Sequence, residues 1–250
     1  VPFRDHVQAV LQRPVELIPY ADARGLMMAL QRKTILYAMG PGTILAATQR
    51  LCSCVEPLAT QPNRDGSVGL YSAVLVPTGG TFRSVSDIGD ARLVITGEGS
   101  AVAHRVGLSE LWSSDIVIDE QNIVFAPNLR EAYARVAAGE AEAVLGWTRQ
   151  VDGSVLFDQE PFNTLSDEDR ASLRILWRSR PVTAHSHFAH RDLGEATLEA
   201  LQSMLTGMTG TDGDAFDAID RGSGRGFVAR SLEDYDVVLD AFAYWNRLNP

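Results

Sequence analysis

Residues 91–104 read ARLVITGEGSAVAH, and the rest of the chain can be understood from this stretch. Its pattern predicts a strand over residues 93–95, a glycine turn, and a helix that begins near Ser100. The first N–H groups of a helix lack partners inside the helix, and the helix dipole makes that end partly positive. Such a turn can therefore seat an anion, with the Ser100 hydroxyl beside it. A plainer interpretation stays open, in which Ser100 only caps the helix.

The same arrangement occurs earlier in the chain. Residues 34–39 predict a strand, which a glycine turn joins to a helix with Thr43 at its start. Strands and helices alternate through the first third of the chain, and this favours a mainly parallel sheet with covered faces. A short strand is also expected at residues 15–18. The pattern restarts after residue 83, where Asn128 is expected to cap a later helix, with a ligand contact as the alternative role.

Composition excludes several classes of partner. The chain has 250 residues and a formal net charge of −10, which argues against nucleic acid and anionic membrane surfaces. No apolar run approaches the 18 or so residues that span a bilayer, so no membrane insertion is expected. The opening residues contain no initiator methionine, which indicates a processed or trimmed form. Cys52 and Cys54 are too close in sequence for an easy unstrained disulfide.

The sequence lacks the common catalytic motifs, namely the phosphate loop, the Gly-x-Ser-x-Gly elbow and the His-Glu-x-x-His helix. We therefore expect no enzyme, no catalytic residue and no cofactor. His185 and His187 would share one face of a strand, with His190 close by, but no third metal ligand is specified. The expectation is a polar segment rather than a metal site. Trp147, at a strand end, is read either as a core residue or as a wall of a ligand cleft.

Several blocks of sequence together resemble the PhnD-like family, the substrate-binding proteins of phosphate, phosphite and phosphonate ABC transporters. The blocks are ALQRKTILYAMGPGTILAA (29–47), LYSAVLVPTGGTFRSVSDIGDARLVITGEGSA (70–101), EAYARVAAGEAEAVL (131–145), LRILWRSRPV (173–182) and SLEDYDVV (231–238). The resemblance implies an α/β fold of the type II periplasmic-binding-protein kind, with two lobes, two crossover hinge strands and a ligand clamped between the lobes. Lobe one would comprise residues 1–85 and 183–250, and lobe two residues 86–182.

The chain departs from the family pattern at the ligand positions. A Ser-Thr-Ser-Gly helix start falls on Ser100, Ala101, Val102 and Ala103, so two hydroxyls are missing. A Ser-His-Asp helix start falls on residues 128–130, where the histidine is lost, and an early tyrosine falls on Ala23. Two carboxylates that receive an amine in some members fall on Arg149 and His185. These changes disfavour an ammonium group in the ligand. The family's N-terminal strand, central in lobe one, also has no counterpart, because this chain begins at the first helix.

The resemblance implies an extracytoplasmic or periplasmic solute-binding protein that takes a small anionic ligand to an ABC transporter permease. A ligand-sensing domain of a signalling protein is the alternative. No metal ligand is assigned. The expected ligand-binding residues are Tyr20, Gly42, Thr43, Gly99, Ser100, Ala101, Val102, Asn128, Trp147, Arg149 and His185.

Overall fold

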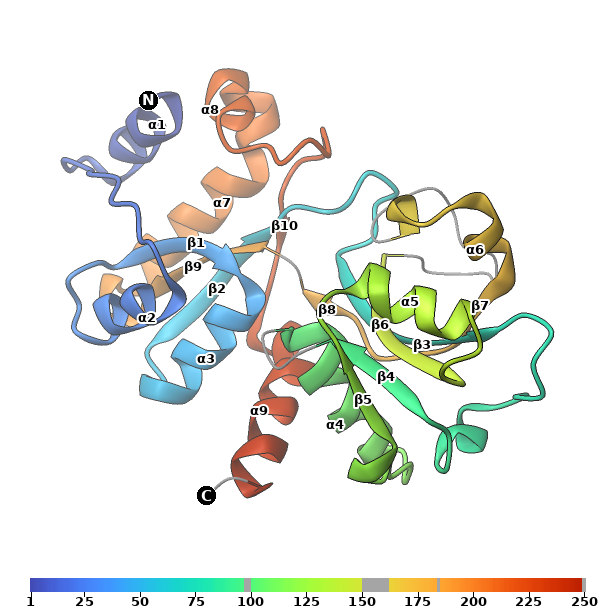
Figure 1. Cartoon of the computed structure of the whole chain (residues 1–250). Helices are drawn as coiled ribbons and strands as arrows, with labels where there is room; N and C mark the ends of the chain where they lie inside the picture. The colour runs from blue at the N-terminus through green and yellow to red at the C-terminus, as the bar shows by residue number, and fades with distance from the viewer. Residues whose placement is uncertain (97–99, 150–161, 184, 249–250) are drawn as a thin grey trace. The chain divides into compact units, whose positions relative to one another are not determined.

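Two mixed α/β units make up the fold (Figure 1). The computed structural model describes residues 1–96, 100–149, 162–183 and 185–248. Unit 1 comprises Val1–Gly69 and Thr183–Leu239, and unit 2 comprises Leu70–Val182 and Asp240–Pro250. The mixed α/β class expected from the sequence is confirmed, since each unit contains one sheet with helices packed on it.

Unit 1 is built around a four-stranded sheet in the order β1-β9-β2-β10. Its strands are β1 (Tyr37–Pro41), β2 (Val55–Thr60), β9 (His185–His190) and β10 (Val228–Ala229). Its helices are α1 (Pro2–Leu11), α2 (Ala23–Gln31), α3 (Gly42–Cys52), η5 (Arg191–Leu193), α7 (Glu195–Thr211), α8 (Gly213–Asp217), η6 (Leu232–Tyr235) and the start of α9 (Asp236–Leu248).

The expectation of a mainly parallel sheet in the first third of the chain was wrong. β9 lies between β1 and β2 and is antiparallel to both, and β10 is antiparallel to β2. Local alternation of strands and helices cannot show this, because β9 comes from the far end of the chain. β9 thus has a central place in the sheet.

Helices cover both faces of the unit 1 sheet (Figure 1). On one face, Leu30 of α2 and Leu45 of α3 pack with Phe188 of β9. On the other face, Phe3 of α1 and Leu205 of α7 belong to a second buried cluster. Strand residues alternate between the two clusters, as a pleated strand covered on both faces requires.

Unit 2 contains a larger sheet, in which β5-β4-β6-β3-β7 are successive neighbours and β8 also pairs with β3. Its strands are β3 (Gly69–Pro77), β4 (Leu93–Thr96), β5 (Ile123–Ala126), β6 (Ala143–Thr148), β7 (Leu173–Arg178) and β8 (Val182–Thr183). Its helices are η1 (Val85–Ile88), η2 (Ala101–Val106), α4 (Gly107–Ser113), η3 (Glu120–Asn122), α5 (Leu129–Ala137), η4 (Phe162–Thr164) and α6 (Asp167–Ser172). β4 is parallel to both β5 and β6, whereas β3 is antiparallel to β6 and β7.

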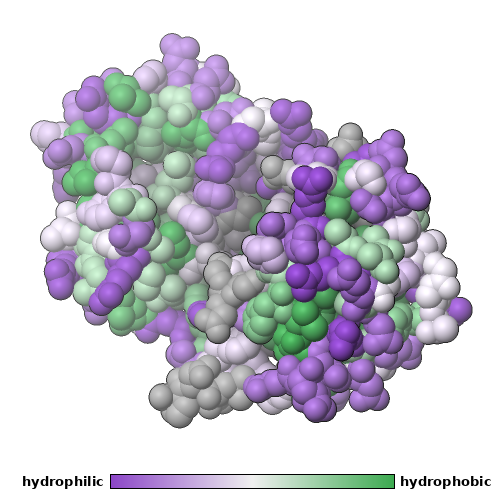
Figure 2. All heavy atoms as spheres, viewed as in Figure 1, coloured by the Kyte–Doolittle hydropathy of each residue, from purple (hydrophilic) through white to green (hydrophobic). Residues whose placement is uncertain are grey.

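Two buried clusters also flank the unit 2 sheet. Tyr133 and Val136 of α5 pack on one face, and Leu111 of α4 packs on the other. β5 is an edge strand, and its Phe125 is 54% exposed. Figure 2 shows apolar side chains gathered over this strand. Within the described residues, no helix is long and apolar enough to cross a membrane.

Two local expectations were wrong. Residues 15–18 form no strand, and Leu17 and Ile18 stay 47% and 50% exposed because no partner strand lies beside them. β2, by contrast, was not anticipated, because Pro57 interrupts its pattern. β2 tolerates this proline at an irregularity in its register with β9, between Pro57 and Ala59.

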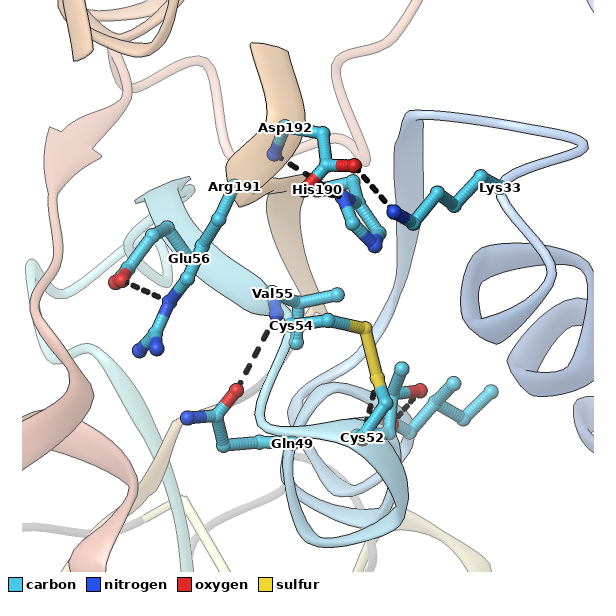
Figure 3. The surroundings of a disulfide bond; sticks show 11 residues. Lys33, Gln49, Cys52, Cys54, Val55, Glu56, His190, Arg191 and Asp192 are labelled. Carbon is cyan, nitrogen blue, oxygen red and sulfur yellow. Dashed lines mark hydrogen bonds and ion pairs between the residues drawn. A yellow bond between two sulfur atoms is a disulfide. The ribbon is translucent and has the colours of Figure 1, made fainter. Parts of the chain in front are cut away.

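The two cysteines do form a disulfide, contrary to expectation (Figure 3). Cys52 ends α3, and Ser53 adopts a left-handed backbone conformation with φ 49° that turns the chain back on itself. The two cysteine Cα atoms are consequently 5.0 Å apart, which is within bridging range. The Gln49 side chain accepts a hydrogen bond from the Val55 N–H at 3.3 Å, so the helix end and β2 are joined at a second point.

Candidate functional site

One edge of the unit 2 sheet collects the ends of four strands. β4, β5 and β6 are parallel, so their carboxyl ends meet at this edge, together with the end of β7 and the start of β3. Ligands of open α/β sheets bind outside the carboxyl ends of strands. The chain leaves β4 at Thr96 and is next described at Ser100, where a helix begins.

The structure shows Ser100 as a helix cap, and its role in an anion seat stays a prediction. Ser100 is the N-cap of η2, and its Oγ accepts a hydrogen bond from the Ala103 N–H at 3.1 Å. η2 is a π-helix that runs directly into α4. Ala101 and Val102 are the first two residues of η2, so their N–H groups lie at the positive end of the helix. Wide helical turns of this kind are frequent at functional sites.

Two contacts hold this helix start close to the sheet. The hydroxyl of the buried Ser72 in β3 donates a hydrogen bond to the Val102 carbonyl oxygen. Gly107, at the junction of η2 and α4, lies so close to β6 that an added Cβ would be 2.7 Å from the Leu145 side chain. A larger residue at 107 would push the helix start away from the strand ends.

A buried hydroxyl lies at the same edge. Thr96, the last residue of β4, is 7% exposed, and its Oγ1 has no hydrogen-bond partner among the described residues. A buried polar atom without a partner costs on the order of 1–3 kcal/mol. A polar ligand atom or a water molecule at this strand end would satisfy it.

Arg149 and Trp147 come from the end of β6. The Arg149 guanidinium lies over the Trp147 ring, with its carbon 5.7 Å from the ring centroid, and both side chains are half-buried. The cation–π contact orients the guanidinium near the carboxyl ends of the strands. The Arg149 side chain therefore does not point fully into solvent.

A second arginine–aromatic pair was not anticipated from the sequence. The Arg178 guanidinium of β7 lies over the Tyr71 ring of β3, with its carbon 5.5 Å from the ring centroid. Trp147 is opposite Ser72 in the register, and Arg178 is opposite Ala73. Because neighbouring strand residues alternate between faces, the two pairs lie on opposite faces of this edge. Only the strand register brings Tyr71 and Arg178 together, so the sequence carried no signal for them.

Three expected residues share one end of the unit 1 sheet. Gly42 and Thr43 open α3 directly after β1, and Pro41 of β1 is the register partner of His185 in β9. Thr60 Oγ1 donates a hydrogen bond to the His185 carbonyl oxygen at 2.5 Å. Thr43 therefore lies at the positive end of an eleven-residue helix, with His185 beside the preceding strand end.

The neighbouring histidines have structural roles. A hydrogen bond joins His187 Nδ1 to the Tyr37 hydroxyl, and the rings of Phe3 and Phe227 pack against it. Burial, with a smaller effect from nearby His185, lowers the pKa of His187 to about 3. His190 Nδ1 accepts a hydrogen bond from the Asp192 N–H. Across the described ranges, no group of three His, Cys, Asp or Glu side chains is placed to hold a metal ion.

The remaining expected residues are less informative. Asn128 is exposed and caps α5, since its Oδ1 accepts a hydrogen bond from the Glu131 N–H at 2.9 Å. The Tyr20 ring lies beside the first turn of α2, near Gly25. Gly99 lies outside the described residues. A ligand role of these three residues stays a prediction.

Comparisons with known proteins identify the family. Residues 1–235 match the model of the periplasmic phosphonate substrate-binding proteins of ABC transporters. No curated protein matches the chain in sequence.

Solved structures match over nearly the full length. XAC2383 from Xanthomonas citri, bound to ATP, has a TM-score of 0.69 and 14% identity, and the match covers 99% of this chain and 92% of that one. PhnD1 from Prochlorococcus marinus, in complex with methylphosphonate, has a TM-score of 0.59 and 15% identity, with 98% and 90% covered. The aliphatic sulphonate binding protein SsuA from Escherichia coli has a TM-score of 0.52 and 13% identity, with 100% and 90% covered. The expected type II fold is thereby confirmed.

Proposed function

The chain belongs to the family of periplasmic phosphonate substrate-binding proteins of ABC transporters, and we propose that its own ligand is a small oxyanion with a second acidic or neutral polar end. The family match favours this role over that of a sensor domain in a signalling protein. Family members deliver their ligands to transporter permeases, and such a permease is the expected partner of this chain.

The observation that carries the proposal is the pairing of a helix start with an oriented arginine at one sheet edge. Ala101 and Val102 supply N–H groups at a positive helix end, and Arg149 supplies a guanidinium oriented by Trp147. Guanidinium–oxyanion hydrogen bonds are charge-assisted and can be bidentate, so they are stronger than neutral ones. The buried hydroxyl of Thr96 adds a further polar group at the same edge.

The positive charge of Arg149 supports a second acidic or neutral polar end on the ligand. Arg149 and His185 fall on positions where the resemblance places carboxylates that receive an amine. A guanidinium would repel an ammonium group and attract a carboxylate or a second oxyanion. Among the structural neighbours, XAC2383 is bound to ATP, PhnD1 is in complex with methylphosphonate, and SsuA is an aliphatic sulphonate binding protein. All of these ligands carry an oxyanion.

Unit 1 is expected to contribute to the same ligand through Gly42, Thr43 and His185. This contribution stays a prediction, as do the lobe boundaries at residues 85 and 183. Thr43→Ala tests it directly, since the loss of a ligand contact would weaken binding whereas the α3 helix would stay intact.

Isothermal titration calorimetry tests the ligand class. We expect phosphonoacetate or ATP, which carry a second acidic or polar end, to bind with an enthalpy signal, and 2-aminoethylphosphonate to bind much more weakly. A true ligand at about 100 times its Kd should add about 2.7 kcal/mol to the free energy of unfolding. Tight binding of 2-aminoethylphosphonate would overturn the proposal, because it would show that Arg149 and His185 do not exclude an amine.

A further inference from the structure

Two loops of unit 1 are brought together by a strand pair. β10 is antiparallel to β2, and Val228 at the start of β10 is opposite Thr60 at the end of β2. The loop over residues 61–67, which follows β2, therefore meets the loop over residues 220–226, which precedes β10 (Figure 1).

The Gln61 side chain joins the two loops. Its Nε2 donates to Asp220 Oδ1 at 2.6 Å and to the Arg225 carbonyl oxygen at 3.0 Å, and its Oε1 accepts from the Arg221 N–H at 3.0 Å. The Asp220 carboxylate also accepts hydrogen bonds from the N–H groups of residues 223 and 224. This carboxylate is therefore occupied by donors within the loops.

Two arginines tie the loops reciprocally, each through one nitrogen only. Arg64 Nε donates to the Gly222 carbonyl oxygen at 2.8 Å, and Arg225 Nε donates to the Arg64 carbonyl oxygen at 2.8 Å. The Arg225 guanidinium lies against Gly66, where an added Cβ would be 3.6 Å from Nη1. Both guanidiniums are thus held in place while their Nη groups stay available.

The two loops carry a small excess of positive charge, with three arginines against Asp65 and Asp220. Arg64, Arg221 and Arg225 are all exposed, and within the described ranges none of them forms an ion pair. The other carboxylate of the loops, Asp65, accepts hydrogen bonds from the N–H and hydroxyl of Ser67. The chain has 32 acidic against 22 basic residues, so this local excess of unpaired positive charge is unusual for it.

We propose that Arg64, Arg221 and Arg225 form a docking surface, the arginine patch, for an acidic segment of a partner protein. The three arginines are exposed, and a small anion at an exposed site gains little from each contact because water screens it. Several carboxylates on one protein segment would gain from all three arginines together. Hydrogen bonds within the loops fix two of the guanidiniums before a partner binds, and this lowers the entropic cost of binding.

A fluorescently labelled peptide of ten glutamates is the probe, followed by anisotropy at low salt and by ¹H–¹⁵N NMR of the full chain. Shifts should be confined to residues 61–67 and 220–226, and affinity should fall as salt rises. Arg221→Gln should weaken binding by about twofold to fivefold, the range for one exposed charge pair. Its side chain forms no hydrogen bond or ion pair within the described residues, so the fold should not change. Arg13→Gln, at an exposed arginine whose side chain likewise forms no hydrogen bond or ion pair there, is the matched control.

Four outcomes would overturn the proposal. The peptide could fail to bind at millimolar concentration, or its shifts could lie outside the two loops. Arg13→Gln could weaken binding as much as Arg221→Gln does, which would show a response to net charge alone. Inorganic phosphate could shift the same loops at micromolar concentration while the peptide does not, which would identify the patch as a small-anion site.

Discussion

The Arg149 guanidinium stacks on the Trp147 ring at 5.7 Å, at the carboxyl end of β6. Trp147 lies in β6, and Arg149 directly follows the strand two positions on, so the two side chains extend from the same face. The aromatic face limits the rotamers of the arginine and holds its charge beside the strand ends. This relationship makes Arg149 the most direct test of the proposed site.

Arg149→Ala should weaken binding of the anionic ligand by about 1.5–3 kcal/mol, the range for hydrogen bonds to charged groups, which is about tenfold to 150-fold in Kd. Arg149→Glu should abolish binding, because a carboxylate would repel the oxyanion. Calorimetry with the ligand identified by the panel measures both effects, and Arg13→Ala serves as the control. An unchanged Kd in Arg149→Ala would remove this residue from the site.

Ser100 and Asn128 form a matched pair of helix caps, each bonded to the N–H three residues ahead. Replacing either residue by Ala should lower the free energy of unfolding by about 0.5–2 kcal/mol. Only Ser100→Ala should also weaken ligand binding, since its hydroxyl lies beside the open helix start. Urea unfolding and calorimetry separate the two effects. Equal losses of affinity in both variants would mean that Asn128 contacts the ligand too. An unchanged affinity in Ser100→Ala would mean that Ser100 acts only as a helix cap.

Local features of the fold were predictable from the sequence. α2 and α5 begin at the capping residues Asp22 and Asn128, because side-chain oxygens that satisfy the first N–H groups leave a pattern in the sequence. The helix start at Ser100 was found in the same way. Non-local features were not predictable. The central position of β9 depends on a pairing with strands far earlier in the chain, and the Tyr71–Arg178 contact depends on the register of β3 with β7.

The disulfide illustrates the same limit at short range. Sequence separation alone disfavoured a bond between Cys52 and Cys54, but the left-handed Ser53 brings the cysteines together. A backbone conformation of this kind at a serine is uncommon and is stabilised here by the end of α3. Its occurrence agrees with the oxidising compartment of the family.

Reduction of this disulfide should destabilise the protein only modestly. The closed loop is very short, so chain-entropy arguments give a contribution of roughly 1–2 kcal/mol. Urea unfolding with and without dithiothreitol measures it, and a Cys52→Ser, Cys54→Ser variant should match the reduced protein and no longer respond to dithiothreitol. A much larger loss on reduction would mean that the end of α3 and the start of β2 unfold together without the bond.

The last prediction concerns pH. His187 is 2% exposed, and burial lowers its pKa to about 3 from an ordinary value near 6.5. Between these two pH values the unfolded chain binds a proton that the folded chain does not, so stability falls as pH decreases through this window. Between pH 7 and pH 5 this single group should remove about 2 kcal/mol from the free energy of unfolding.

Urea unfolding of the protein and of His187→Phe at several pH values tests this expectation. The variant leaves the Tyr37 hydroxyl without its partner, so its absolute stability will fall, and only the slope with pH is diagnostic. The slope between pH 5 and pH 7 should become flatter in the variant, because the buried imidazole that excludes the proton is gone. Other ionisable groups are present in both proteins and cancel in the comparison. Identical slopes would show that His187 accepts a proton in the folded state, and the packing of Phe3 and Phe227 around a neutral ring would then have to loosen with it.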